Sequence, residues 1–416
     1  MLPIEKIIAD HGPSMGVIIQ ACRVFLQTAT QQELDTLIEK VNPNWQEVAL
    51  LSKVHRIRPV VFRVLMTSIA PAARKEQFKK VLQLNTIQNF TIATETERLI
   101  DLLATAGISA IPYKGVAYSK QFYGDISMRE SSDIDLVIKA DDLPKTFALF
   151  AKDGYQQFNP GLYKALGQEQ YVVLEKDLSY DKIGNGADRF HVELHYKITH
   201  PRFGAPDRIN QFDLSSTVAS ELNSGLAQFL TRPEHFRAIT LHHLLHDGLE
   251  YLKIFVDLAV GVTSLTKSVD TDNSTSTASV SDLQTALSSL ATTYHTNALF
   301  LAMDKLVGVG SIVVQQKSKE EENLSSKIVV FNLDSTVGRY KRHRVLSLLN
   351  HYKRSISNRA ALLRDEKERK RFQKKYWINL FMPQQADEEA IPLPQFLRPF
   401  YFIIRPIRIL LRKKSD

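Results

Sequence analysis

Residues 132–138 (SDIDLVI) alternate polar and branched apolar side chains, a pattern that predicts a short β-strand with one buried face. Side chains two positions apart on a strand share a face, so Asp133 and Asp135 point to the same side, about 7 Å apart at the backbone. Two like charges this close are unfavourable unless a cation neutralises them. Carboxylate ligands suit Mg²⁺ or Mn²⁺. The alternative interpretation is an acidic strand edge that faces water.

Basic residues and a glycine precede this strand. Lys114 and Gly115 end a predicted strand at 108–113 and lead into a predicted helix. A glycine at such a turn lets backbone amides approach a phosphate, and Lys114 adds a positive charge. Arg129 lies just before the two aspartates and is a candidate ligand for a further phosphate oxygen. We also count Ser132 among the candidate nucleotide-binding residues.

A third carboxylate follows on another alternating run, residues 190–196, where Glu193 shares a strand face with His191 and His195. Placed beside the aspartates, Glu193 would complete a two-metal site or take the proton from an attacking hydroxyl. The alternative is a zinc or iron site formed by Glu193 and the two histidines. The neighbouring aspartate pair favours the oxygen-rich magnesium site.

The hydrophobic periodicity predicts a small α/β module inside a helical protein. We divide the chain into a helical region at 1–85, an α/β core at 86–215, a helical domain at 216–338 with a Ser/Thr-rich loop at 267–281, and a basic helical tail at 339–416. Within the core we expect helices at 86–106 and 141–153, and strands at 108–113, 133–138, 171–175 and 190–196. The first helix is expected to bury a stripe formed by Ile87, Phe90, Leu99, Leu102 and Leu103.

Composition narrows the class of protein. The 416 residues are 44% hydrophobic and 24% charged, which is ordinary for a globular chain. The single cysteine, Cys22, excludes a disulfide framework and a multi-cysteine metal centre. No apolar run reaches about 18 residues, and no signal-peptide core is recognisable near residue 1, so we expect a cytoplasmic protein.

The net charge of +8 is unevenly distributed. Residues 339–416 carry 20 Lys and Arg against 7 Asp and Glu, whereas the rest of the chain carries 33 against 38. An anionic partner is therefore expected for the tail alone. Residues 396–411 (FLRPFYFIIRPIRILL) could lie on an anionic membrane surface. We favour the alternative, in which Phe400, Tyr401 and Ile404 pack back onto the catalytic part.

These motifs, in this order, resemble the nucleotidyltransferase superfamily that includes DNA polymerase β, and more narrowly an uncharacterised bacterial nucleotidyltransferase family. The resemblance covers about residues 86–200. It rests on Tyr113-Lys114-Gly115, Tyr123, Arg129, Asp133-Ile134-Asp135-Leu136-Val137-Ile138, Gly154-Tyr155 and Glu193-Leu194-His195-Tyr196. Val116 replaces the small residue that the wider superfamily has after the glycine. Glu193 and Tyr196 stand where the narrower family more often has Asp and Trp.

The resemblance implies an α+β fold, with a small mixed-sheet, polymerase β-like core embedded in a largely helical protein. It also implies metal-dependent transfer of a nucleoside monophosphate from an NTP, with ATP expected, to a hydroxyl or phosphate of an acceptor that the sequence does not identify. Gly115 and Lys114 would grip the triphosphate, Asp133 and Asp135 would bind Mg²⁺ or Mn²⁺, and Glu193 would act as ligand or base. The alternatives are a non-catalytic nucleotide-binding module and, less favoured, a nucleic-acid-binding protein that uses its basic tail.

A weaker resemblance to the family continues at His242, His243, His246, Lys253 and Asp257. The histidines are best interpreted as helix-packing and hydrogen-bonding groups, and a metal cluster is the alternative. The i,i+4 spacing of Lys253 and Asp257 favours a helix ion pair. The competing interpretation is that Lys253 reaches the nucleotide from the helical domain.

Overall fold

The computed structural model describes residues 1–158, 160–183, 189–267, 280–310, 313–314, 318–341, 353–354, 356–381, 391, 393, 397 and 400–411. Most of these residues are helical. The N-terminal region forms five helices, α1 (Ile4–His11), α2 (Pro13–Phe25), α3 (Gln31–Val41), α4 (Trp45–Val54) and α5 (Arg58–Thr67). Side-chain caps fix two of their starts: Thr30 forms a capping box with Glu33, and Asn44 accepts from the amides of Gln46 and Glu47.

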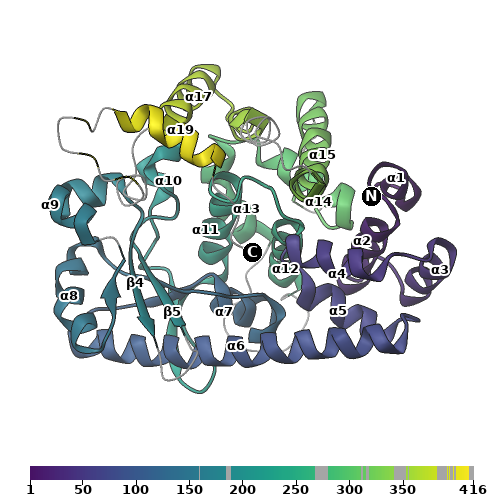
Figure 1. Cartoon of the computed structure of the whole chain (residues 1–416), viewed down its shortest axis with the longest axis horizontal. Coiled ribbons are helices and arrows are strands. Elements are labelled where there is room, and N and C mark those ends of the chain that lie inside the picture. The colour runs from purple at the N-terminus through teal and green to yellow at the C-terminus, as the bar shows by residue number, and fades with distance from the viewer. Residues whose placement is uncertain are drawn as a thin grey trace.

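Helix α6 (Ala72–Thr105) is the longest element and runs beneath both the N-terminal helices and the sheet (Figure 1). It passes without interruption through the predicted segment boundary at residue 85. The predicted buried stripe is partly wrong, because Ile87 is 63% exposed and Phe90 47% exposed, whereas Asn89 is fully buried. The reason is that Asn89 donates to two backbone carbonyls, so a polar residue occupies the buried face.

A five-stranded mixed sheet follows, in the order β1 (Ile111–Tyr113), β2 (Ile134–Val137), β5 (Arg189–His195), β4 (Asp177–Ile183) and β3 (Gln156–Gln157). Strands β2 and β5 are parallel, and the other pairs are antiparallel. Val192 and Leu194 of β5 are fully buried, which leaves the intervening polar side chains on the opposite face. The expected α+β class, a small mixed sheet within a largely helical protein, is confirmed.

Helices pack around this sheet, and short elements connect them: α7 (Gly115–Tyr118), the π-helix η1 (Ser119–Tyr123), the 3₁₀ turns η2 (Ile126–Met128), η3 (Ala140–Asp142) and η4 (Pro201–Phe203), and helices α8 (Leu143–Lys152), α9 (Pro160–Leu174) and α10 (Asp207–Asn210). The predicted strand at 171–175 is wrong, because residues up to Leu174 belong to α9. Tyr171 packs there against Tyr163 with ring centroids 5.0 Å apart, so tertiary contacts override the strand preference of the valines that follow.

The hairpin of β6 (Thr217–Glu221) and β7 (Leu226–Leu230) was not expected, since the sequence from residue 206 onward was interpreted as helical. Its turn carries Asn223, Ser224 and Gly225, whose amides all donate to Glu97 of α6. A polar turn with glycine between two alternating runs is a hairpin signal. The sequence therefore did contain the information that would have predicted it.

The C-terminal half returns to helices: α11 (Arg232–Leu245), α12 (Leu252–Lys267), α13 (Val280–Ala291), α14 (Thr296–Val307), α15 (Lys319–Lys341), α17 (Glu366–Phe381) and α19 (Tyr401–Leu411). Most of the Ser/Thr-rich stretch, 268–279, and residues 342–352 of the basic tail lie outside the described residues. The division into four segments stays a prediction. No described helix combines the length and the apolar character needed to cross a bilayer.

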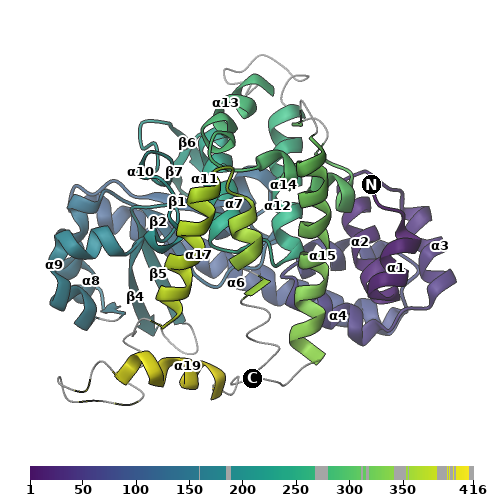
Figure 2. The same cartoon turned by 90° about the horizontal axis from the view of Figure 1, so that it is seen from above.

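Helix α19 packs beside α17 at the edge of the molecule (Figures 1 and 2). The Tyr401 side chain is buried, and its hydroxyl donates to the carbonyl of Ile391 and accepts from the amide of Leu393. Phe400, by contrast, is exposed, so the expectation that it packs inward is wrong. Both partners of Tyr401 belong to the tail itself, and the tail contacts the rest of the fold through α17, which packs on η4 (Pro201–Phe203).

Candidate active site

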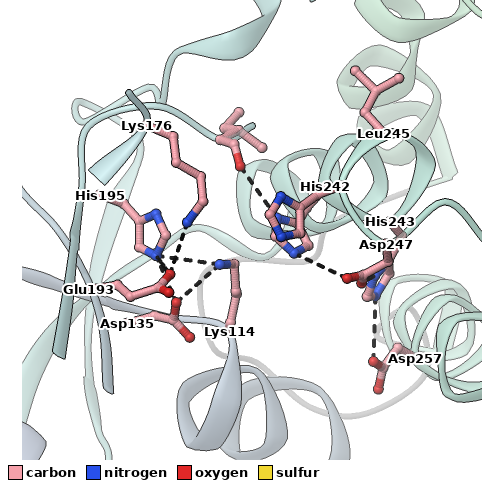
Figure 3. Close-up of polar contacts among 12 residues, drawn as sticks. Lys114, Asp135, Lys176, Glu193, His195, His242, His243, Leu245, Asp247 and Asp257 are labelled. Carbon is pink, nitrogen blue, oxygen red and sulfur yellow. Dashed lines mark hydrogen bonds and ion pairs between the residues drawn. The ribbon is translucent and has the colours of Figure 1, made fainter. Parts of the chain in front are cut away.

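The parallel pairing of β2 with β5 brings two predicted site residues together. In this register Asp135 lies directly opposite Glu193, and Tyr113 of β1 lies opposite Asp135 on the other side. Carboxylate oxygens of Asp135 and Glu193 and a ring nitrogen of His195 all lie within 4.8 Å of one another. Figure 3 shows these side chains converging from the sheet on Lys114. The predicted partnership of Asp135 with a carboxylate on a later strand is therefore present.

Asp135 is held by two nitrogen groups. Its carboxylate is only 3% exposed, accepts from the ammonium of Lys114 at 3.0 Å and lies 2.7 Å from Nε2 of His195. Burial alone would raise its pKa, but Lys114 and His195 hold the pKa below its usual value. Burial would likewise lower the pKa of Lys114, and the carboxylates of Asp135, Glu193 and Asp133 raise it instead. Both groups are therefore charged at neutral pH.

Glu193 is also surrounded by cationic or hydrogen-bonding partners. Its Oε2 lies 2.9 Å from the ammonium of Lys176 and 3.1 Å from Nε2 of His195, and its Oε1 lies 3.8 Å from Nε2 of His191. Burial opposes ionisation, but His191, His195 and Lys176 hold the Glu193 pKa well below its usual value. The hydrogen bonds to Glu193 and Asp181 raise the pKa of His191 to about 9. The donors around Glu193 thus stabilise its ionised form.

Asp133 lies just before β2 and lines the same cleft, yet it stands outside the cluster of Asp135, Glu193 and His195. Within the described residues its carboxylate has no hydrogen bond and no ion pair. Burial, and then the charge of Asp135, raise its pKa. Unlike the carboxylates of Asp135 and Glu193, that of Asp133 is not neutralised by a cationic side chain among the described residues.

The turn at Lys114 and Gly115 adopts an unusual backbone conformation. Lys114 has φ +53° and ψ −149°, a region that non-glycine residues rarely enter, and Gly115 follows with φ +34°. Conformations of this kind cost about 1–3 kcal/mol and concentrate at functional sites. Here the Lys114 ammonium reaches Asp135, and Gly115 and the exposed Ser132 line the cleft. The predicted strand–glycine–helix turn is present, with α7 as a single helical turn.

Arg129 is buried, and each of its three guanidinium nitrogens donates to a protein group. Its Nε and Nη2 donate to the two oxygens of Asp257 at 3.1 and 3.0 Å, and Nη1 donates to the carbonyl of Gly115. The hydroxyl of Tyr123 donates to the same carboxylate at 2.7 Å. Burial would raise the Asp257 pKa, but Arg129 and its other neighbours hold it well below its usual value. Arg129 therefore joins the turn at Lys114 and Gly115 to α12. The predicted ion pair of Lys253 with Asp257 is wrong, because Arg129 pairs with this carboxylate instead.

The N-terminal helices hold the loop that leads to Asp133. Asn89 on α6 donates to the carbonyls of Ile126 and Arg129, both at 2.7 Å, and Gln88 donates to that of Ser131. From α5, Arg58 makes a bidentate pair with Glu130 of the same loop. The path of residues 126–131, and with it the position of Asp133, is thus fixed from outside the sheet.

A helical wall closes the cleft opposite the carboxylates, and the cleft encloses about 160 Å³. The wall carries His242, His246 and Asp247 from the end of α11, and Tyr251 and Lys253 from the start of α12. Burial lowers the pKa of Lys253 to about 8, an effect that the nearby charge of Arg129 reinforces. In the described part of the chain neither Lys253 nor Arg56, which also lines the cleft, forms an ion pair. Two basic groups therefore face the cleft without a carboxylate partner.

Sequence reasoning missed three residues of this site. Lys176 precedes β4 in an ordinary charged stretch, and no local pattern points to its contact with Glu193. Arg56 lies more than 50 positions before the first motif and stacks on Tyr251 with its guanidinium carbon 4.8 Å from the ring centroid. His195 was noted on the correct strand face but was not assigned to the site. Only the last of these had a signal, the alternation of residues 190–196.

Comparison with known proteins gives one clear result. No curated protein matches the chain. Residues 42–300 match the sequence profile of a family described as an uncharacterised nucleotidyltransferase. The matched region begins before α4, contains the whole sheet and the helical wall, and ends in α14. The chain belongs to this uncharacterised nucleotidyltransferase family.

Proposed function

Membership of the family supports nucleotidyl transfer from an NTP as the general class of reaction. That general class is what the family shows; the donor, ATP, the acceptor's hydroxyl or phosphate and the release of pyrophosphate are what we propose for this protein. The observation that carries the proposal is the register of β2 and β5. It sets Asp135 beside Glu193 in a cleft that also contains Asp133, Lys114 and Gly115.

The carboxylates fit a divalent cation. Asp135 and Glu193 present oxygens within 4.8 Å of each other, and the protein's own ammonium groups from Lys114 and Lys176 lie against them, as expected for a site that attracts cations. We propose that Asp133, Asp135 and Glu193 hold Mg²⁺ or Mn²⁺. Bound there, such ions would neutralise charge on the triphosphate and activate the acceptor oxygen. The depressed pKa of Glu193 favours the role of ligand over that of base.

Each remaining cleft residue has a role in this proposal. The backbone at Gly115 and the Ser132 hydroxyl contact phosphate oxygens, and Lys114 would be able to contact the phosphates if a bound cation shared Asp135. Arg129, which donates to Asp257 and to the Gly115 carbonyl, positions Gly115 in this proposal. The acceptor oxygen forms a bond to the α-phosphorus, and a hydroxyl acceptor gives its proton to solvent. The bond from that phosphorus to the bridging oxygen of pyrophosphate breaks, and pyrophosphate leaves.

Lys253 is expected to bind the β- and γ-phosphates, because it lines the cleft and forms no ion pair with any residue that the structure describes. Its pKa of about 8 means that the charge is present below that pH and is lost as the pH rises above it. NTP affinity of the wild type should therefore fall between pH 7 and pH 9.5, and Lys253→Ala should weaken it about 10- to 100-fold at pH 7. Lys253→Arg should remove the pH dependence, because arginine keeps its charge.

Equilibrium binding of a non-hydrolysable NTP analogue would measure these affinities, with Lys53→Ala, an exposed lysine of α4, as the matched control. Unchanged affinity in Lys253→Ala would remove Lys253 from the phosphate site.

The proposed activity is tested by incubating the full chain with α-labelled NTPs, Mg²⁺ or Mn²⁺, and fractions of small molecules, lipid-linked sugars, proteins and nucleic acids. Label that becomes attached to one fraction, with matching release of pyrophosphate, identifies the acceptor class. Saturable NTP binding without transfer to any fraction would support the non-catalytic binding module instead.

For the tail, we propose packing on the fold rather than contact with an anionic membrane. The supporting observations are that Tyr401 is buried and that α19 packs on α17, which in turn contacts η4 of the body. Deleting residues 396–416 is expected to lower Tm, which thermal unfolding would measure. An unchanged Tm, together with salt-sensitive flotation of the intact protein on anionic vesicles, would establish the membrane surface as the partner.

A further inference from the structure

The helical wall of the cleft carries imidazoles and a carboxylate that the proposed reaction does not use. His242 lies in the last turn of α11, and His246 and Asp247 follow directly. The rings of His242 and His246 stack with centroids 4.6 Å apart and an interplanar angle of 21°. Nitrogen atoms of these rings and a carboxylate oxygen of Asp247 all lie within 4.8 Å of one another. Three donor groups are thus gathered at one end of one helix.

Hydrogen-bonding groups on the far side of His242 and Asp247 orient these two donors. Nδ1 of His242 faces the carbonyl oxygen of Ile198 at 3.4 Å, and Nδ1 of His243 lies 2.6 Å from Oδ2 of Asp247 (Figure 3). Metal-binding histidines and carboxylates are typically oriented by hydrogen bonds of this kind. On its other side, Nε2 of His243 lies 3.5 Å from Oδ2 of Asp257, an electrostatic contact rather than a hydrogen bond. His243 is therefore a positioning residue for Asp247.

His246 has an unexplained polar atom. Its Nδ1 is buried and has no hydrogen-bond partner among the residues that the structure describes. The nearest aromatic neighbours are the stacked ring of His242 and the ring of Phe203, with centroids 5.8 Å away. Buried nitrogen atoms without a partner are rare in native proteins. Helix packing, the interpretation favoured from the sequence, leaves this nitrogen without a hydrogen bond. A bound cation would explain why two imidazoles and a carboxylate are gathered here.

We propose that His242, His246 and Asp247 bind one divalent transition-metal ion, with Zn²⁺ the best match. Two imidazoles and one carboxylate are typical zinc donors, and two histidines four residues apart on a helix can share one ion. Mg²⁺ prefers oxygen donors and is disfavoured by the same set. Zinc with three protein ligands keeps a fourth position for water or substrate, and this position would open to the cleft.

This second metal centre lies across the cleft from the carboxylates and does not depend on the proposed transfer reaction. The ammonium groups on the sheet side, Lys114 and Lys176, are compensated by their ion pairs with Asp135 and Glu193. The cleft would then have two chemically distinct walls, an oxygen-rich wall for Mg²⁺ and an imidazole wall for Zn²⁺. A single divalent ion bound by both walls would contradict this arrangement.

The test uses the full chain after treatment with a chelator. Titration with Zn²⁺ against a chromophoric chelator should show one tight site that millimolar Mg²⁺ does not displace. A His242→Ala, His246→Ala double variant should weaken zinc binding by more than about 100-fold, and His243→Ala by about 10- to 100-fold, because it removes only an orienting partner. Asp135→Asn and the remote His11→Ala should bind zinc as the wild type does.

Spectroscopy of the wild-type protein keeps the proposal testable if the histidine variants fail to fold. With Co²⁺ in place of Zn²⁺, an imidazole-rich site of low coordination number gives strong visible absorption, whereas an oxygen-rich octahedral site gives weak absorption. Failure to bind zinc tightly, weak cobalt absorption, or loss of zinc in Asp135→Asn with retention in the double variant would each overturn the proposal. None of these outcomes bears on whether the protein transfers nucleotides.

Discussion

Replacing Asp135 with asparagine is expected to reduce nucleotidyl transfer by about 10³-fold or more, because the neutral amide cannot share a cation with Glu193 in the transition state. Mg²⁺-dependent stabilisation by NTP should be lost with it, since ligand-induced stabilisation follows binding to the native state. Transfer of α-label and the Tm with and without Mg²⁺ and NTP would measure both effects. Asp133→Asn is expected to behave in the same way.

Two controls test whether a loss of transfer is specific to Asp135 and is not caused by unfolding. Asp141→Asn changes a carboxylate in the nearby turn η3 and should leave transfer unchanged. Circular dichroism of Asp135→Asn should be like that of the wild type, although the ammonium of Lys114 loses its partner. Full turnover by the double variant Asp133→Asn, Asp135→Asn would show that these carboxylates do not form the metal site.

Breaking the pair of Arg129 with Asp257 is expected to have the largest effect on stability. The two side chains are 4% and 0% exposed, and Arg129→Ala leaves a buried carboxylate without its bidentate partner. Removing one member of such a pair costs about 3–5 kcal/mol of unfolding free energy. Denaturant unfolding would measure the loss. Because Arg129 also holds the Gly115 carbonyl, NTP binding should weaken as well.

Comparison with an exposed ion pair tests whether burial is the reason for this large loss of stability. Lys6 and Asp10 form an exposed i,i+4 pair, so Lys6→Ala should cost less than about 1 kcal/mol. A double variant, Arg129→Met with Asp257→Leu, should be more stable than Arg129→Ala, because no buried charge is left unpaired. Equal losses for Arg129→Ala and Lys6→Ala would show that the buried pair is not a stabilising feature.

The carboxylates on the strands could be predicted because polar and apolar side chains alternate along each strand. A period of two places Asp135 on one face of β2 and Glu193 on one face of β5, whereas Asp133 lies just before β2 and outside their cluster. The pairing of β2 with β5 could not be derived this way, since 50 or more residues separate the strands and no local signal specifies their register. The resemblance to a nucleotidyltransferase core supplied that information.

Contacts between distant segments account for what the sequence did not reveal. Arg129 was expected to face a phosphate, yet its partner is Asp257 of α12, more than 100 positions away. Lys253 was expected to pair with Asp257 at helical spacing, and Arg129 takes that carboxylate instead. Asn89 is buried on α6 where Ile87 and Phe90 were expected, because it donates to carbonyls of a loop that only the tertiary fold brings near. In each case a local rule was overridden by a distant partner.

The continuity of α6 has a practical consequence for dissecting the protein. A shortened chain that starts at residue 86, the predicted start of the α/β core, would lose Asn85 and place Gln88 and Asn89 in a fraying first turn. It would also lose Arg58 and Arg63, which hold the loop from the α5 side. At 1.5 Å per residue the intact helix spans about 50 Å, and both the N-terminal helices and the sheet pack along it. We therefore expect a shortened chain to keep the loop at 126–131 in place only if it retains the N-terminal helices.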